Sequence, residues 1–120
     1  MRDQRLWTWH VGAGIVILVF LGLHMAIMHV DTLLGVFNAP RTEAIDWENV
    51  VHRAQSAFFV VTYVVLLGTA LFHGLYGLRN IVFELNPTSG LKKAVNVVLL
   101  IGGIGLFGLG AWAAIASRAL

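Results

Sequence analysis

Residues 11–30 read Val-Gly-Ala-Gly-Ile-Val-Ile-Leu-Val-Phe-Leu-Gly-Leu-His-Met-Ala-Ile-Met-His-Val, without a single Asp, Glu, Lys or Arg. A helix needs about 20 mostly apolar residues to cross the ~30 Å hydrocarbon core of a bilayer, and this stretch has that length. It is too long for the core of a secretory signal peptide, and no small-x-small cleavage site precedes the next polar segment. We therefore expect a retained transmembrane helix.

The rest of the chain repeats this pattern. Hydrophobic residues make up 58% and charged residues 12% of the 120 positions, and the mean hydropathy is +0.82. A soluble domain carries about 25% charged residues, roughly twice this fraction. Apolar segments at about 9–36, 54–83 and 93–117 predict three spans, which must be helical because a lipid-exposed backbone has to satisfy its own hydrogen bonds. The sequence thus predicts an all-α membrane protein with a single transmembrane domain over residues 1–120.

Basic residues at the ends of the spans predict an orientation. Five lie on the N-terminal side of the membrane and three on the other side: Arg2, Arg5, Arg79, Lys92 and Lys93 against Arg41, Arg53 and Arg118. Because positive charge favours the inner side, we expect a prokaryotic cytoplasmic membrane protein with a cytoplasmic N-terminus and an external C-terminus.

The longest polar linker covers residues 37–53. A turn is predicted at residues 38–40. Thr42 or Asp46 is expected to cap a short surface helix, with Trp47 as an interfacial anchor.

Several kinds of chemistry are excluded by composition and spacing. The chain has no cysteine, and therefore no disulfide, iron–sulfur cluster or cysteine nucleophile. Its basic residues form no cluster typical of nucleic-acid binding, so we expect no nucleic-acid partner. No His, Asp and Glu set has zinc-site spacing, and no nucleophile–base pair is evident.

Five histidines in so apolar a chain are its most informative residues, because ionisable groups inside a span are costly and usually functional. His73 lies in the second span, six residues before Arg79 and roughly 9 Å inside the boundary at 1.5 Å per residue. Gly77, one turn on, leaves room for a flat macrocycle, and Thr69, one turn back, offers a hydroxyl or carbonyl to fix the imidazole tautomer. A cofactor ligand and a histidine bonded to a neighbouring helix are both open interpretations.

His24 lies in the middle of the first span, near Gly22 and on the same helix face as Met28. No polar residue lies within one turn on that face, so we expect its partner to be a cofactor or another subunit. His29 lies about 140° further round the helix. It is expected to form an interfacial polar pair with Asp31.

His10 and His52 lie at span ends, where a side chain reaches water easily, and both are expected to be interfacial. The fourteen-residue spacing of His10 and His24 resembles the paired ligands of the quinol-oxidising cytochrome b of bc-type complexes. That architecture requires a second helix with the same spacing, which His52 and His73, twenty-one residues apart, do not provide.

The third span carries a run of glycines: Gly102, Gly103, Gly105, Gly108 and Gly110. Glycines permit close helix contact. The contact is either with helices of this chain or with helices of a partner, and both interpretations are open.

Residues 71–84, Leu-Phe-His-Gly-Leu-Tyr-Gly-Leu-Arg-Asn-Ile-Val-Phe-Glu, resemble the second helix of the small membrane-anchor subunit (SdhD type) of succinate dehydrogenase and fumarate reductase. In that family a haem-ligating histidine precedes a glycine four positions on and an acid, near the quinone site, eleven positions on. His73, Gly77 and Glu84 occupy these places, and Arg79 occupies a basic position seen in many bacterial members. The segment around His24 is similar to the histidine-bearing first helix of two-haem members.

This resemblance implies a membrane-anchor cytochrome b subunit of succinate:quinone oxidoreductase, respiratory complex II, forming half of a heterodimeric haem-binding bundle. One or two haems b are shared with a second membrane cytochrome b subunit, with His73 and His24 as axial ligands of the haem iron and Gly77 packed against the haem. Arg79 and Glu84 lie on the side of the quinone or of the haem propionates. The soluble partners are an iron–sulfur subunit and a flavoprotein subunit, on which the flavin chemistry takes place.

One departure from the family bears on the quinone. Single-haem members that use ubiquinone carry a tyrosine directly after the acid, whereas this chain has Leu85. The difference favours menaquinone.

Two alternatives remain open. One is a haem-free structural anchor whose histidines bond to partner helices. The other is the cytochrome b anchor of another respiratory enzyme, such as a hydrogenase or formate dehydrogenase, although those anchors usually have more spans.

Overall fold

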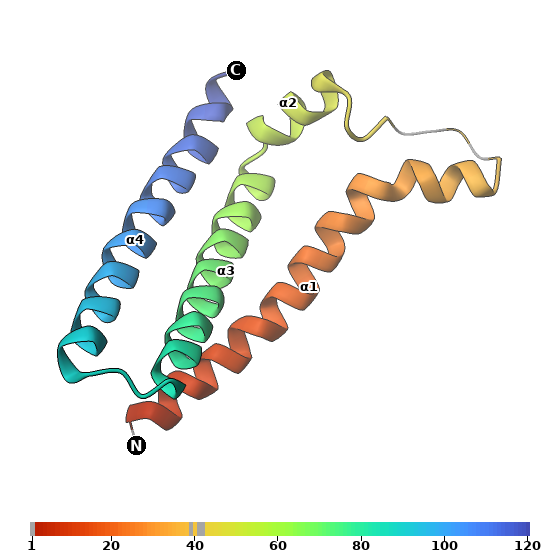
Figure 1. Cartoon of the computed structure of the whole chain (residues 1–120). Helices are drawn as coiled ribbons and strands as arrows, with labels where there is room; N and C mark the ends of the chain where they lie inside the picture. Colours follow the sequence, from red (N-terminus) through yellow and green to blue (C-terminus); the bar gives the residue numbers. More distant parts are fainter. Residues whose placement is uncertain (1, 39, 41–42) are drawn as a thin grey trace.

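The structure is a computed structural model that describes residues 2–38, 40 and 43–120, with side chains from Gln4 onward. Over this part of the chain the regular structure is entirely helical (Figure 1), and its elements are α1 (Arg2–Val36), α2 (Trp47–Gln55), α3 (Ala57–Glu84), α4 (Ser89–Ala116) and the short 3₁₀ turn η1 (Ser117–Ala119). Three of the helices, α1, α3 and α4, are long and apolar enough to cross a membrane. The all-α fold with three membrane-spanning helices, predicted from hydropathy, is confirmed.

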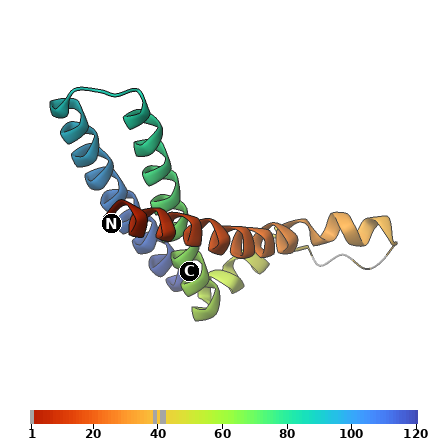
Figure 2. The same cartoon turned by 90° about the horizontal axis from the view of Figure 1, so that it is seen from below.

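The three long helices run alternately up and down the molecule. α3 contacts both α1 and α4, and α4 runs antiparallel beside it. α1 crosses α3 and then diverges from it towards its own C-terminal end (Figures 1 and 2). The N-terminus therefore lies at the same end of the bundle as the α3–α4 turn, and α2 and the C-terminus lie at the opposite end (Figure 1).

The residue that precedes each of two helices explains where that helix begins. Ser56 adopts extended dihedrals, φ −75° and ψ 123°, and so separates α2 from α3, which starts at Ala57 and not near residue 54. α4 starts at Ser89 and not at residue 93, because Thr88 Oγ1 accepts a hydrogen bond from the Leu91 N–H at 3.4 Å and caps the helix. The first turns of α4 therefore lie outside its most apolar part.

The linker after α1 begins with a left-handed residue. Asn38 has φ 53°, a conformation that asparagine tolerates and that commonly terminates helices. Asp46 is the N-cap of α2, without a side-chain cap hydrogen bond. Thr42, the other expected cap, and Arg41 lie outside the described residues, as does the side chain of Arg2.

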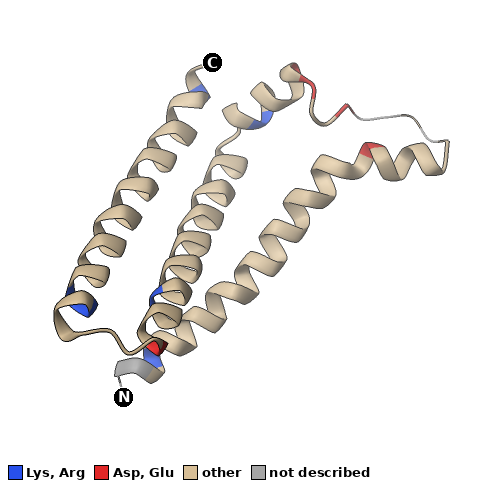
Figure 3. Ribbon diagram, viewed as in Figure 1, with Lys and Arg blue, Asp and Glu red and all other residues tan. Residues whose placement is uncertain are grey.

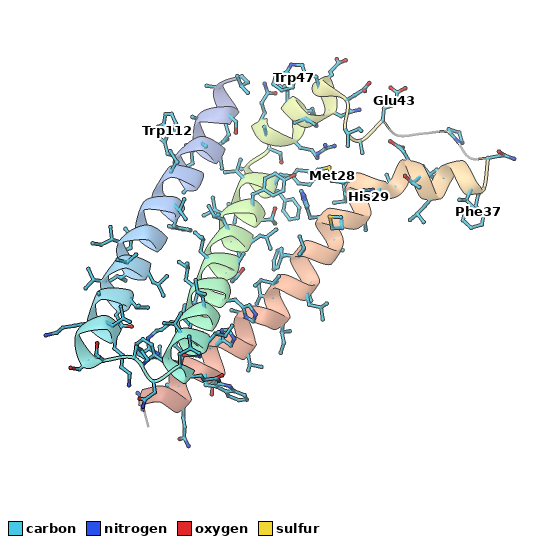
Figure 4. All side chains as sticks on the ribbon, viewed as in Figure 1. Met28, His29, Phe37, Glu43, Trp47 and Trp112 are labelled. Carbon is cyan, nitrogen blue, oxygen red and sulfur yellow. The ribbon has the colours of Figure 1, made fainter. Side chains whose placement is uncertain are left out.

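Ala44 ties the linker to two helices. Its N–H donates to Asp31 Oδ2 of α1 at 3.0 Å, and its carbonyl accepts from the guanidinium of Arg53 on α2. Trp47 on α2 is 72% exposed and Trp112 on α4 67% exposed. Both project outward at this end of the molecule (Figure 4), as tryptophans of a membrane-interface belt do.

Almost none of the apolar surface is buried within the chain. Among the described residues only Ala13, Ala44 and Val60 are buried, whereas Leu18 is 75% exposed and Ile104 65% exposed. Charged side chains lie at the two ends of the bundle, and the middle of each long helix carries none (Figure 3). Apolar surface on this scale is stable only against lipid or partner helices. The chain is thus a multi-pass membrane protein.

The glycines of α4 fall into two groups. A Cβ added at Gly103 would lie 2.8 Å from Leu75 Cδ1 of α3, and one at Gly110 would collide with the side chain of Leu67. By contrast, a Cβ at Gly102, Gly105 or Gly108 would meet nothing within 4 Å. Gly103 and Gly110 therefore serve packing within the chain, while the other three leave a smooth strip on the free side of α4.

Candidate functional site

Two histidines meet where α1 crosses α3. The rings of His10 on α1 and His73 on α3 are stacked, with centroids 4.1 Å apart and an interplanar angle of 3°. His10 was expected at the membrane interface, but the structure places it against the histidine predicted to be a ligand. The tilted ring of Tyr76, 5.3 Å from His10, closes one side of the pair.

The stacked pair is accommodated by one glycine from each helix. A Cβ at Gly14 would lie 3.1 Å from His73 Cε1, and a Cβ at Gly77 would lie 3.3 Å from His10 Cε1. Contacts of this length are tighter than ordinary van der Waals separation, so a larger residue would push the rings out. Gly77 is predicted to make room for a flat macrocycle; in the structure its neighbour is the imidazole of His10.

The tautomer of His73 follows from its hydrogen bond. His73 Nδ1 lies 2.9 Å from the backbone carbonyl oxygen of His10. A carbonyl can only accept, so Nδ1 carries the hydrogen and Nε2 keeps a free lone pair. Thr69, expected to fix this tautomer, instead donates to the carbonyls of Val65 and Leu66 in its own helix. The physical reason is that a helical threonine reaches its own preceding turn more easily than a side chain one turn further on.

Two ring nitrogens of the pair have no hydrogen-bond partner among the described residues. Among the described residues, His73 Nε2 has no hydrogen-bond partner in the structure. His10 Nδ1 is buried and likewise unsatisfied, although buried polar atoms are nearly always bonded. Stacked face to face, the two rings cannot serve as ligands on opposite sides of one metal ion, because the lone pairs of their ring nitrogens lie in the ring planes and do not point towards each other.

His24 occupies a second position between α1 and α3. It borders a small hollow of about 100 Å³ whose walls are almost entirely apolar and aromatic, and its ring meets Tyr63 edge-on at 5.7 Å and 85°. The described part of the chain offers this imidazole no hydrogen-bond partner. Fourteen residues separate it from His10, which places it roughly 21 Å further along the helix axis at 1.5 Å per residue. His24 and His73 therefore lie at two different depths of the membrane.

Arg79 and Glu84 do not join either histidine. Arg79 turns to the opposite neighbour of α3, where its Nε donates to Asn96 Oδ1 of α4 at 2.7 Å and its guanidinium lies 4.2 Å from the Phe83 ring centroid. Glu84 is exposed at the last residue of α3. Of the predicted site residues, the structure thus brings together His73 and Gly77, and holds His24, Arg79 and Glu84 apart from them.

The remaining histidines offer no additional centre. His29 and His52 are exposed. Within the described ranges no group of three His, Cys, Asp or Glu residues is close enough to hold a metal ion.

Comparison with known proteins gives one relative. The succinate dehydrogenase hydrophobic membrane anchor subunit of Thermoplasma acidophilum is 22% identical over 88 residues, which cover 73% of this chain. The match spans 65% of that relative, slightly less than two thirds of its length. No family model and no solved structure matches the chain significantly.

Proposed function

We propose that this chain is a membrane-anchor cytochrome b subunit of a succinate:quinone oxidoreductase, binding one or two haems b together with a second membrane subunit. The similarity to a succinate dehydrogenase membrane anchor supports the enzyme class. The membrane topology and the family signature around His73 support the same assignment.

The observation that carries the haem assignment is the state of His73. Metal-bound histidines almost always donate the second ring N–H to a carbonyl or carboxylate, which leaves the other nitrogen free for the metal. His73 Nδ1 makes this donation to the His10 carbonyl, and Nε2 has no partner among the described residues. The apolar surroundings of His73 suit a porphyrin face, while the space beside Gly77 is filled by the His10 ring. These residues therefore suit a haem iron.

His24 is the ligand of the second haem in this proposal. It lies between the same two helices, roughly 21 Å from His10 along the axis of α1, and its imidazole finds no polar partner in the described chain. An unpaired imidazole within a bilayer is costly unless a ligand or partner satisfies it. Each haem then needs one more imidazole, supplied by the partner subunit, and this shared ligation holds the two chains together.

A bound haem supplies one-electron redox chemistry, with a potential set by its axial ligands and their surroundings. The residues of this chain fix the ligands in place and exclude water from them. Electrons come from the flavoprotein and iron–sulfur subunits and reach a quinone, with menaquinone favoured by Leu85. Glu84, at the end of α3, is proposed to orient the quinone or the haem propionates, or to relay quinone protons, while Arg79 is turned towards Asn96 of α4.

The proposal includes a sidedness. The N-terminus and the α3–α4 turn lie together at one end of the bundle (Figure 1), and this end is proposed to face the cytoplasm of a prokaryote, where the soluble subunits dock. His73 is the nearer of the two proposed ligands to this end.

The test is a reduced-minus-oxidised spectrum of the complex purified through this chain. We expect b-type bands, and we expect His73→Ala to lose one haem while the chain stays in the membrane. A complex with full succinate:quinone activity and no b-type bands identifies a haem-free structural anchor instead. Co-purification of hydrogenase or formate dehydrogenase subunits identifies a different respiratory enzyme.

A further inference from the structure

An open groove of about 500 Å³ runs between α3 and α4, away from the histidines. On α3 it extends from Gly68 to Arg79, and on α4 from Asn96 to Phe107. Its lining is leucine, isoleucine, glycine and aromatic side chains, apart from the polar groups of Tyr76, Arg79 and Asn96. A volume of this size lies within the ~300–1,000 Å³ range of small-molecule sites.

The length and polarity of the groove define the shape of its occupant. Eleven residues separate Gly68 from Arg79, or roughly 16 Å at 1.5 Å per residue. This is about half of the ~30 Å hydrocarbon thickness, the depth of one leaflet. The charged group stands at the membrane-surface end and the apolar walls continue inward. The occupant is therefore amphipathic, with one polar end and a long apolar part.

The polar end of the groove is cationic and has no acidic partner in the chain. Arg79 donates to Asn96 Oδ1 at 2.7 Å and to Asn80 Oδ1 at 3.3 Å, both neutral amides. Arg79 and Lys92 both lie against the ring of Phe83, at 4.2 and 5.7 Å from its centroid. In the part of the chain that the structure describes, neither cation is paired with a carboxylate. Two neighbouring positive charges without a counter-ion favour an anion between them.

A second hollow extends this cationic end. It is bordered by Lys92, Lys93 and Asn96, and Asn96 also lines the apolar groove. A headgroup seated beside the lysines is therefore continuous with an alkyl chain lying along α3 and α4.

We propose that this groove binds one anionic phospholipid, with its phosphate at Arg79 and Lys92 and an acyl chain between α3 and α4. The charge complementarity selects this occupant. A neutral isoprenoid quinone leaves both cations unpaired, and a zwitterionic lipid brings a positive charge of its own towards them. The lipid fastens α4 to α3 at the end of the bundle where the two helices are joined. The site does not depend on whether the chain binds haem.

Native mass spectrometry of the full chain in detergent tests the site, with phosphatidylglycerol and phosphatidylcholine of identical acyl chains as probes. We expect phosphatidylglycerol to bind about tenfold more tightly. Arg79→Gln should lower its affinity about tenfold, as expected for loss of a charged hydrogen bond. Arg118→Gln removes the same charge at the other end of the chain and should leave the affinity unchanged.

A second pair of variants tests the apolar part of the groove. Ile104, 65% exposed, lines it, while the neighbouring Ile101, 66% exposed, does not. Ile104→Trp should fill the groove and reduce phosphatidylglycerol occupancy at least fivefold, whereas Ile101→Trp should not. The proposal is overturned if Ile104→Trp and Ile101→Trp reduce phosphatidylglycerol binding equally. It is also overturned if Arg79→Gln and Arg118→Gln do so.

Two competing ligands complete the test. Glycerol phosphate carries the headgroup chemistry without the chain, and it should not compete at a tenfold excess over the lipid. Effective competition by it shows a simple anion site and rejects the lipid. Displacement of phosphatidylglycerol by one equivalent of menaquinone assigns the groove to the quinone and also rejects the proposal.

Discussion

The ring nitrogen Nδ1 of His73 donates to the backbone carbonyl of His10 across 2.9 Å, and the two imidazoles lie parallel with centroids 4.1 Å apart. One residue of α1 thus acts on His73 twice, through its main chain and through its ring. The main-chain contact sets which nitrogen of His73 is free. The ring contact fixes the orientation of the imidazole plane. His10 is a positioning residue in this arrangement and not a second ligand.

Replacing His10 with phenylalanine separates these roles. Phenylalanine keeps a ring against His73 and keeps the backbone carbonyl. It also removes the buried Nδ1, which has no hydrogen-bond partner; burying such an unsatisfied polar atom costs about 1–3 kcal/mol of stability. We expect His10→Phe to retain every haem of the parent complex and to resist detergent denaturation at least as well. The measurement is haem per protein together with a thermal denaturation curve. Loss of one haem, as in His73→Ala, would show that His10 is itself a ligand.

Gly14→Ala should disturb His73 from the opposite helix. The added Cβ would lie 3.1 Å from His73 Cε1, so the ring has to shift, and overpacking of this kind costs about 1–3 kcal/mol. Gly12→Ala is the matched control, because a Cβ there meets nothing within 4 Å and both changes give the same gain in helix propensity. Unfolding in increasing dodecyl sulfate, followed by helical circular dichroism, should rank Gly14→Ala below Gly12→Ala. Identical curves would contradict the packing described here.

His24 and His29 should differ in haem binding. His24 lies between α1 and α3 beside Tyr63, whereas His29 is exposed. We expect His24→Ala to remove one haem, about half of the b-type absorbance of a two-haem complex, and His29→Ala to remove none. Pyridine haemochrome analysis of both complexes measures this. Full haem retention in His24→Ala would show that His24 is not a haem ligand.

Features that depend on a single helix could be predicted from the sequence, whereas features that depend on how the helices pack could not. Hydropathy predicts the three long helices because each is an isolated segment whose length is set by the bilayer. The pairing of His73 with Gly77 follows from helix geometry, since residues four apart share a face. Neither the presence of the three helices nor the spacing of His73 and Gly77 depends on how the helices pack.

The contact between His10 and His73 depends on packing and was therefore missed. Sixty-three residues separate them, and their meeting requires the crossing point of α1 and α3 to be known. Hydropathy at a span end indicates proximity to water, but it does not show that the His10 ring lies against His73 of a neighbouring helix. The glycine at position 14 is the one local signal, because a small residue one turn after a histidine permits another helix to approach.

The two groups of glycines on α4 predict different defects. Gly103→Ala should be less stable than Gly102→Ala, because the new Cβ would lie 2.8 Å from Leu75 Cδ1, so the end of the Leu75 side chain has to rotate away, while both changes give the same gain in helix propensity. A Cβ at Gly102 would meet nothing within 4 Å, so Gly102→Ala should not destabilise the lone chain. If the free strip of α4 packs against the partner subunit, Gly102→Ala should instead weaken recovery of the partner in affinity purification. Unchanged recovery would assign that strip to lipid.

Orientation is open to a direct measurement, because the chain has no cysteine and single cysteines can be placed at will. Ser89 at the α3–α4 turn and Ala119 near the C-terminus are both exposed and lie at opposite ends of the bundle (Figure 1). Five basic residues against three predict that the α3–α4 turn faces the cytoplasm. A membrane-impermeant maleimide should therefore label Ala119→Cys in intact spheroplasts, and Ser89→Cys only after permeabilisation. The reverse pattern would place His24 and not His73 nearer the cytoplasm, and soluble electron donors docking there would face the wrong end of the proposed haem pair.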